Sequence, residues 1–387
     1  MKQKVNKILF TLLRSAICGN KQDIDKNTIS SEELTRELYE LSRKHDVAHL
    51  VGIGLGAEAN FLKDNQYVDR FSKETIKAVY RYERLNYDLE KICRAFDAAE
   101  LPYMPLKGSV IRKFYDAPWM RTSCDIDILI HKEDIEKASA VLIDMCGCKR
   151  DAETTHDISF FTKNRNNAEL HYSLTEEGVS KKVTELLDSV WDTAILKSGY
   201  CYEMPDEMFY FYHIAHMAKH FENGGCGIRP FIDLWILDNL EGDFAAKRNE
   251  LLERGELLKF AESARKISRV WFGSEDHDDV TLEMEKYILR GGAFGTAENR
   301  ISVQQQKKGG SWRYIKNEIF LSYEHIKHMY PVLKKHRWLT PVMQVRRWFR
   351  IIFEGRAGQA ISDLKYSRSM TRKENAKVKE FLKRIGL

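Results

Sequence analysis

The sequence predicts an α+β protein in which a unit of short strands and helices lies between two helical regions. Apolar residues recur at helical spacing over about the first hundred residues, and the same spacing returns beyond Pro205. Between these regions, short apolar runs alternate with helical stretches, which is typical of an α/β or α+β unit. We therefore predict an N-terminal helical region over 1–100, a central unit over 101–205 and a C-terminal helical region over 206–387.

The N-terminal region is expected to begin with an amphipathic helix rather than a signal peptide, because Arg14 interrupts a short apolar run. The apolar face of this helix would be formed by Val5, Ile8, Leu9, Leu12 and Leu13. Ser30 with Glu33 predicts a capping box at the start of a second helix. A long helix is predicted over 73–100, with Ile76 and Tyr80 on its apolar face.

The central unit has predicted strands and helices in alternation. Strands are expected at 103–106, 126–130, 158–161 and 168–174, and helices at 110–115 and 135–145. Lys107-Gly108-Ser109 lies at the first turn from strand to helix, where glycine permits close approach of the backbone and a helix N-terminus favours an anion.

Composition excludes several classes of protein. Of the 387 residues, 43% are hydrophobic, which is enough for a substantial core, and no run is long enough to span a membrane. The seven cysteines lack zinc-ribbon spacing, so we expect reduced thiols and a cytoplasmic location.

Positive charge is concentrated near the C-terminus, where residues 331–387 hold 15 Lys and Arg against 4 Asp and Glu. Within it, residues 333–353 interleave basic and aromatic side chains. Three interpretations remain open: an amphipathic helix with a solvated basic face, a segment lying on an anionic membrane, or a nucleic-acid contact. A final basic helix over about 373–385 is expected to be exposed.

The strongest chemical signal is Asp125-Ile126-Asp127 at the start of a predicted strand. The two-residue period of a strand places both carboxylates on one face and directs the isoleucine to the other. Two adjacent carboxylates repel each other, and a divalent metal would relieve that repulsion. Magnesium prefers such oxygen ligands together with substrate phosphates. A solvated strand end would also explain the pair.

Further polar residues lie at suitable places around the two acids. Arg121 precedes the acidic strand and suits bidentate contact with a phosphate. Glu169 and His171 share one face of a later strand and add a third carboxylate. Each also has a structural interpretation, as a surface arginine or as side chains of an edge strand.

Two features of the C-terminal region extend this set. His213, His216 and His220 fall on one helical face, but their spacing matches no known zinc pattern, so core or phosphate-contacting histidines are favoured. Arg229 and Asp233 are expected to form an i, i+4 pair at a cleft wall, with structural and substrate-contact roles both open.

The order K-G-S, R-x3-D-I-D-I-L and E-L-H-Y-S-L resembles the nucleotidyltransferase superfamily that includes DNA polymerase beta. It is more closely similar to a bacterial branch of uncharacterised nucleotidyltransferases, over roughly residues 35–355. The interval from Ser109 to Asp125 is longer than the superfamily usually has. The resemblance implies a nucleotidyltransferase-fold mixed sheet with an N-terminal helical cap and a C-terminal helical domain.

The resemblance also implies roles for residues. Asp125, Asp127 and Glu169 would hold two Mg²⁺ ions as catalytic ligands, with Glu169 or a metal-bound hydroxide as the candidate base. The residues expected to bind the NTP are Lys107, Gly108, Ser109, Arg121, His171 and Arg229.

The activity that the resemblance implies is transfer of a nucleotidyl group from an NTP to a hydroxyl or phosphate of a small acceptor. Two alternatives remain open: a macromolecular acceptor such as tRNA or protein, as in toxin-like members, or a non-catalytic nucleotide-binding protein. The basic C-terminal region adds an anionic membrane surface or nucleic acid as expected partners, with a peripheral membrane location in the first case.

Overall fold

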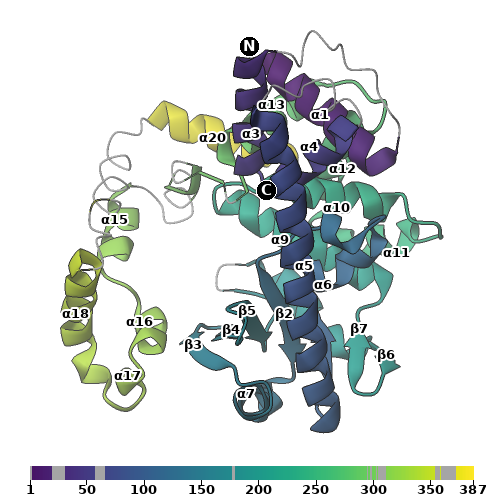
Figure 1. Ribbon diagram of the computed structural model, residues 1–387. Helices are drawn as coiled ribbons and strands as arrows, with labels where there is room; N and C mark the ends of the chain where they lie inside the picture. The colour runs from purple at the N-terminus through teal and green to yellow at the C-terminus, as the bar shows by residue number, and fades with distance from the viewer. Residues whose placement is uncertain are drawn as a thin grey trace.

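The computed structural model describes residues 2–19, 31–56, 66–176, 179–293, 295–296, 299–301, 303, 311–353, 358 and 372–387. Figure 1 shows a central sheet with helices packed around it and a further group of helices set apart from this body. Helices at both ends of the chain enclose a seven-stranded mixed sheet, so the predicted α+β class is confirmed.

The N-terminal region is helical, as predicted. Its described helices are α1 (Lys2–Cys18), α3 (Glu32–Lys44), α4 (Ala48–Leu55) and α5 (Gln66–Ala98). The predicted apolar face of α1 is buried along its whole length. Gly54 of α4 packs so closely on α1 that an added Cβ would lie 2.2 Å from the carbonyl oxygen of Leu12.

Two details of this region correct the prediction. Ser31 is the N-cap of α3, because its hydroxyl accepts a hydrogen bond from a backbone N–H in the first turn, and Ser30 lies outside the described residues. The long helix α5 begins before Lys73, and its first half packs on α4 with a different face from the one expected. Ile76 and Tyr80 are therefore 69% and 66% exposed.

The sheet has the strand order β3-β4-β5-β2-β1-β7-β6. Its strands are β1 (Tyr103–Pro105), β2 (Asp125–Ile130), β3 (Lys149–Glu153), β4 (Asp157–Phe161), β5 (Asn167–His171), β6 (Ile195–Ser198) and β7 (Cys201–Glu203). The pairs β2–β5 and β1–β7 are parallel, and the other neighbours are antiparallel. The sequence did not predict β3, β6 and β7. β3 and β6 are exposed edge strands that lack an apolar alternation, and β7 is an inner strand of only three half-buried residues.

Helices cover both faces of the sheet. On one face, the second half of α5 and α7 (Ile135–Asp144) pack on Ile126, Ile128 and Ile130. On the other face, Leu129 joins a larger core that includes α9 (Asp206–Glu222) and the N-terminal helices. A shorter helix, α8 (Lys181–Asp188), lies between β5 and the β6–β7 pair in the chain and contacts α9.

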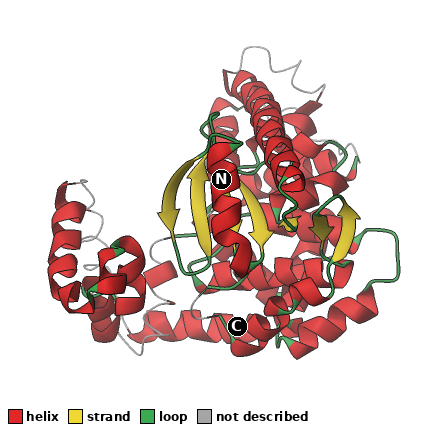
Figure 2. Cartoon of the chain, turned by 90° about the horizontal axis from the view of Figure 1, so that it is seen from below, coloured by secondary structure: helices red, strands yellow, loops and turns green. Residues whose placement is uncertain are grey.

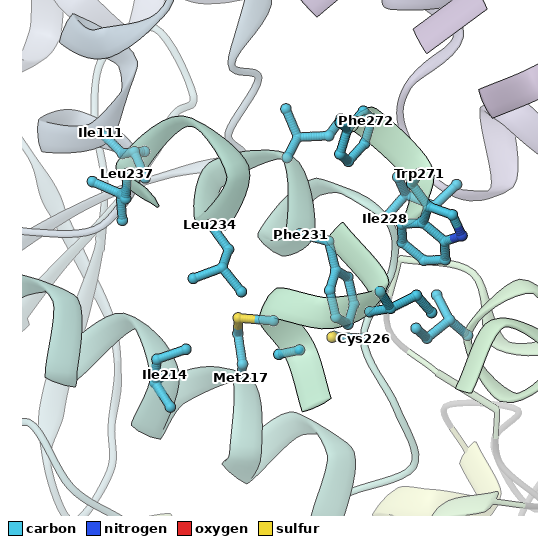
Figure 3. Close-up of a cluster of buried hydrophobic side chains, with 14 of the residues drawn as sticks. Ile111, Ile214, Met217, Cys226, Ile228, Phe231, Leu234, Leu237, Trp271 and Phe272 are labelled. Atoms are coloured by element: carbon cyan, nitrogen blue, oxygen red, sulfur yellow. The ribbon is translucent and has the colours of Figure 1, made fainter. Parts of the chain in front are cut away.

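The C-terminal helices complete the larger core. These are α10 (Arg229–Asp238), α11 (Ala245–Arg254), α12 (Leu258–Phe272) and α13 (Asp279–Gly291). Figure 3 shows side chains from α9, α10 and α12 meeting in this core. α1 packs on α12, where Phe10 stacks on Trp271 and Arg14 donates to the carbonyl oxygens of Val270 and Trp271. A single core thus joins helices from both ends of the chain.

A separate group of helices follows, formed by α15 (Ser311–Ile319), α16 (Tyr323–Met329), α17 (Val332–Lys335) and α18 (Thr340–Phe353). It projects from the body in both views (Figures 1 and 2) and has a small core of its own around Ile326, Tyr330 and Leu333. Within the described residues, no helix combines the length and apolarity that crossing a bilayer requires.

The last helix, α20 (Arg372–Ile385), corrects the expectation that it is exposed. Phe381, Leu382 and Ile385 are buried in the main core, and the helix contacts α12 and α13. The basic side chains that the structure describes, those of Lys377, Lys379, Lys383 and Arg384, are exposed, so the helix is amphipathic.

Candidate active site

The three predicted acids lie on one face of the sheet. β2 and β5 pair in parallel with Asp127 opposite Glu169, so their side chains lie next to each other across the two strands. Asp125 is two residues before Asp127 and shares that face, whereas Ile126 and Ile128 are buried in the core on the other face. The arrangement predicted from the two-residue period is confirmed.

Two nitrogen groups contact Asp127 on the same carboxylate oxygen. Lys107 Nζ lies 2.8 Å from Oδ1, and His171 Nε2 lies 2.9 Å from it. Among the described residues, no hydrogen bond reaches Oδ2 of Asp127 or the carboxylate of Asp125. These oxygens remain available for a further ligand from the cleft.

Glu169 is the more accessible acid of the parallel strand pair. Asn167 Nδ2 donates to its Oε1 at 2.8 Å, and His171 Nε2 lies 3.5 Å from its Oε2. His171 therefore lies between Asp127 and Glu169 and is within reach of both. Asp127, Glu169 and His171 bring their donor atoms within 4.8 Å of one another, a separation that suits a metal ion.

The environment separates the pKa values of the two aspartates. Burial and the neighbouring Asp127 raise the pKa of Asp125 to about 6, despite the opposing effect of Lys107. Burial also opposes ionisation of Asp127, but Lys107 and the hydrogen bond from His171 outweigh it and lower its pKa below the usual range. For His171, hydrogen bonds to Asp127 and Glu169 outweigh burial and raise the pKa.

The Lys107-Gly108-Ser109 turn lies at the end of β1, where α6 (Gly108–Ile111) begins. Lys107 takes the left-handed conformation, with φ of 45°, which directs the chain sharply into α6. Gly108 is buried against Ser123, and a Cβ at this position would lie 3.0 Å from that of Ser123. Lys107 and Gly108 line the cavity, whereas Ser109 does not, and its backbone N–H is bonded to Leu106.

Arg121 has a protein partner rather than an open phosphate position. Its Nε lies 2.7 and 2.9 Å from the two oxygens of Asp233, which is fully buried. Tyr115 also donates to Asp233, at 2.6 Å. Arg121 still lines the cavity, so it could face a ligand while Asp233 holds it in place.

The expected Arg229–Asp233 pair is wrong. Arg229 Nη1 lies 2.8 Å from Asp46 Oδ2 and also donates to the carbonyl oxygen of Thr122 at 2.7 Å. Asp46 belongs to the turn between α3 and α4, so Arg229 joins the N-terminal helices to the segment before β2. The i, i+4 rule failed because both side chains found stronger partners outside their own helix.

A cavity of about 450 Å³ lies over the acids, between the sheet and helices α9 and α10. Its lining includes Asp125, Asp127 and Glu169 from the sheet, and it ends at Ala293 beyond α13. At Gly227, an added Cβ would lie 2.8 Å from the Cα of Ala293. The predicted cleft between sheet and C-terminal helices is therefore present.

His213, His216 and His220 form one wall of this cavity, as their common helical face predicted. His213 Nε2 lies 3.0 Å from the carbonyl oxygen of Pro230, and His216 and His220 approach each other within 3.2 Å. Burial lowers the pKa of all three, to about 4 for His220. They thus present neutral imidazoles to the cavity.

The structure adds cavity residues that the sequence did not single out. His156 Nε2 lies 3.3 Å from both Asp157 and Glu176, and Lys219 Nζ lies 2.6 Å from Glu176. Lys219 follows His216 by three residues, so the helical face of the histidines could have revealed it. Glu176 lies in a loop after β5 and carried no such signal.

The oxygen donors of the sheet fit magnesium better than a softer metal. Asp125, Asp127 and Glu169 offer carboxylates, and Oδ2 of Asp127 has no hydrogen-bond partner among the described residues. A second group, His156, Asp157 and His171, also brings its donor atoms within 4.8 Å and shares His171 with the first. Its two imidazoles are less suited to magnesium.

Comparison with known proteins agrees with this geometry. A protein-family model described as "Uncharacterised nucleotidyltransferase" matches residues 31–273, which include the sheet, all three acids and the helices that bound the cavity. The predicted resemblance over 330–353 lies beyond this match. No curated protein and no solved structure matches the chain significantly. Because residues 31–273 are more than half of the chain, the protein belongs to this family of uncharacterised nucleotidyltransferases.

Proposed function

We propose that the protein transfers a nucleotidyl group from an NTP to a hydroxyl or phosphate of a small acceptor, with magnesium. The observation that carries this proposal is the group of three carboxylates, Asp125, Asp127 and Glu169, on one sheet face beneath a polar cavity. Its volume of about 450 Å³ falls in the range of small-ligand sites, as a nucleotide pocket requires.

The three carboxylates are the proposed metal ligands. Bound magnesium would neutralise charge on the phosphates and polarise the reacting oxygens, which is the main requirement of phosphoryl-type transfer. His171 would act as a positioning residue, because it lies between Asp127 and Glu169 and orients one oxygen of each. The separation of the pKa values keeps Asp127 ionised and therefore ready to bind a cation.

The phosphates are proposed to lie next to Lys107 and Arg121, which both line the cavity. Lys107 Nζ already lies beside the acids, so a triphosphate bound there would come within its reach. Asp233 fixes the guanidinium of Arg121 through two contacts, which reduces the entropy lost on binding. Gly108 would contribute its small size, and Arg229 would support the cleft through Asp46.

Calorimetric titration of each NTP with and without magnesium tests the metal–nucleotide site. We expect binding that needs magnesium in the wild type and is lost in Asp127→Asn. Asp144→Asn is the matched control, because Asp144 is an exposed carboxylate at the end of α7, away from the cavity. Thermal unfolding of each variant shows whether lost binding reflects lost structure.

Labelled nucleotides then identify the group that is transferred. With α-labelled NTP, nucleotidyl transfer places the label on the acceptor and releases pyrophosphate, whereas terminal phosphoryl transfer requires γ-label. Label entering tRNA or protein would replace the small acceptor with a macromolecule. Absence of magnesium-dependent binding for all four NTPs would overturn the proposal.

A further inference from the structure

The segment 332–353, formed by α17, a 3-10 helix at Arg337–Leu339 and α18, has an unusual surface. Half of the eighteen large hydrophobic side chains that are exposed in the described part of the chain lie between residues 320 and 353. Contiguous exposed apolar surface of this kind marks an interaction site in a folded protein. The segment also lies outside the residues that match the family.

The exposed apolar side chains of α18 form one continuous stripe. At 100° per residue they fall within an arc of about 100°. Phe353 is 86% exposed, and Trp338, in the preceding 3-10 helix, is 75% exposed. The members of the stripe on α18 are Val342, Val345, Phe349, Ile352 and Phe353.

The opposite face of α18 is fixed to the neighbouring helices. Gln344 is buried and donates to the carbonyl oxygen of Leu321 at 2.6 Å, and Trp348 Nε1 donates to that of Ile319 at 2.9 Å. Trp348 also packs against Phe320. Because these contacts define the inner face, they hold the apolar stripe towards the solvent.

The charge of the segment is of one sign. Residues 332–353 contain six Lys and Arg residues and no Asp or Glu. Arg346 and Arg350 are exposed and flank the apolar stripe on one side of α18, and Arg337 is exposed next to Trp338. An apolar stripe with basic side chains beside it is complementary to a layer with an anionic surface and a hydrocarbon interior.

We propose that segment 332–353 binds the surface of an anionic lipid bilayer, with α18 lying in the plane of the interface. Val345, Phe349 and Ile352 would enter the acyl region, and Arg346 and Arg350 would contact lipid phosphates. Nucleic acid fits less well, because a nucleic-acid surface places cations at the centre of the contact, whereas apolar side chains occupy the centre here and the arginines lie to one side. The site is separate from the cleft and does not depend on the proposed catalysis.

Co-sedimentation of the full chain with vesicles tests the proposal. We expect binding to vesicles containing phosphatidylglycerol and much weaker binding to pure phosphatidylcholine. The double variant Phe349→Asp/Ile352→Asp should lose at least about tenfold in partitioning, because it places two charges in the acyl region. Ile76→Asp/Tyr80→Asp is the matched control, since these side chains are 69% and 66% exposed on α5, away from the segment, and should bind as the wild type does.

The basic side chains give a second, independent readout. Arg346→Gln/Arg350→Gln should weaken binding to anionic vesicles, and added salt should reduce wild-type binding more than that of this variant. Circular dichroism of each variant verifies that its helices are intact. Three results would overturn the proposal: no vesicle binding, equal binding by the stripe variant and the wild type, or self-association or RNA binding through the stripe in place of lipid binding.

Discussion

The cleft and the 332–353 segment place polar and apolar groups in opposite ways. In the cleft, carboxylates and cations are buried together, and nearly every one has a partner of opposite charge. In α18, apolar side chains face solvent beside arginines. Both arrangements depart from ordinary burial, in which charge is exposed and apolar surface is covered. The two regions differ in the ligand that they suit. The cleft suits a metal and phosphates, and α18 suits a bilayer.

The largest expected effect on activity comes from replacing Asp125, and it tests whether this carboxylate serves function at a cost in stability. Asp125→Asn should lower nucleotidyl transfer by roughly 100- to 1,000-fold, because it removes a charged ligand at the reacting phosphates. It should raise the free energy of unfolding of the metal-free protein at pH 7.5 by about 1 kcal/mol. The raised pKa of Asp125, about 6, means that its ionised form is unfavourable in the fold, and an amide removes that cost.

Product assays and chemical denaturation measure the two effects, with Asp144→Asn as control. A variant that loses both activity and stability would show that Asp125 is structural. A variant that keeps activity would remove it from the catalytic group.

Substitution of two phenylalanines compares the stability that a buried apolar side chain and an exposed one contribute. Phe260→Ala should lower the free energy of unfolding by about 3–5 kcal/mol, because Phe260 is fully buried in the main core. Phe349→Ala should change it by less than about 0.5 kcal/mol, since Phe349 is 56% exposed. Urea unfolding of both variants measures these changes in the free energy of unfolding. A large loss in Phe349→Ala would mean that the stripe on α18 is covered by protein rather than open to a bilayer.

Removing Asp233 tests how far the cleft depends on paired charge. Asp233→Ala should destabilise the protein by about 3–5 kcal/mol, because it leaves Arg121 buried without its carboxylate partner. Glu185→Ala, which breaks an exposed pair with Lys181, should cost less than about 0.5 kcal/mol. Thermal and urea unfolding of the two variants measure these losses of stability. Similar small losses in the two variants would indicate that water reaches the Arg121 site.

The last prediction concerns pH. Burial lowers the pKa of His45 to about 4, from 6.5 in an unfolded chain. The unfolded state therefore binds the extra proton first, so stability is complete above pH 6.5 and falls as the pH drops towards 4. The loss is on the order of 2–3 kcal/mol.

The free energy of unfolding should therefore fall less steeply with acid in His45→Gln than in the wild type. The exposed His336 of the 332–353 segment gives the control, His336→Gln, which should follow the wild-type curve. Parallel curves for the wild type and His45→Gln would contradict the assignment.

The sequence predicted the acids well because their placement is local. A strand alternates its side chains, so Asp125 and Asp127 must share a face, and Glu169 reaches them once β5 lies beside β2. The partner of Arg121 could not be predicted in the same way. Asp233 lies 112 residues further on, and only the position of α10 beside the segment before β2 in the folded chain brings it near.

The strands at the edges of the sheet were not predicted for a different physical reason. β3 and β6 are exposed edge strands, so they need no apolar alternation and leave no pattern to recognise. On α5, helical spacing correctly predicted that one face is apolar and buried. Which face is buried depends on the packing of α4, and the sequence of α5 alone does not contain that information. Likewise, the sequence does not predict the buried apolar side of α20, because lysines dominate the composition of this helix.

The contact between α1 and α12 has a consequence for synthesis of the chain. Arg14 and Phe10 contact Val270 and Trp271, so α1 cannot complete its packing until residues some 250 positions further along the chain have been synthesised. Until then, α1 has α3 and α4 as packing partners, and only the side that meets α12 stays uncovered. Contacts between such distant parts of the sequence should make folding slow for a largely helical protein.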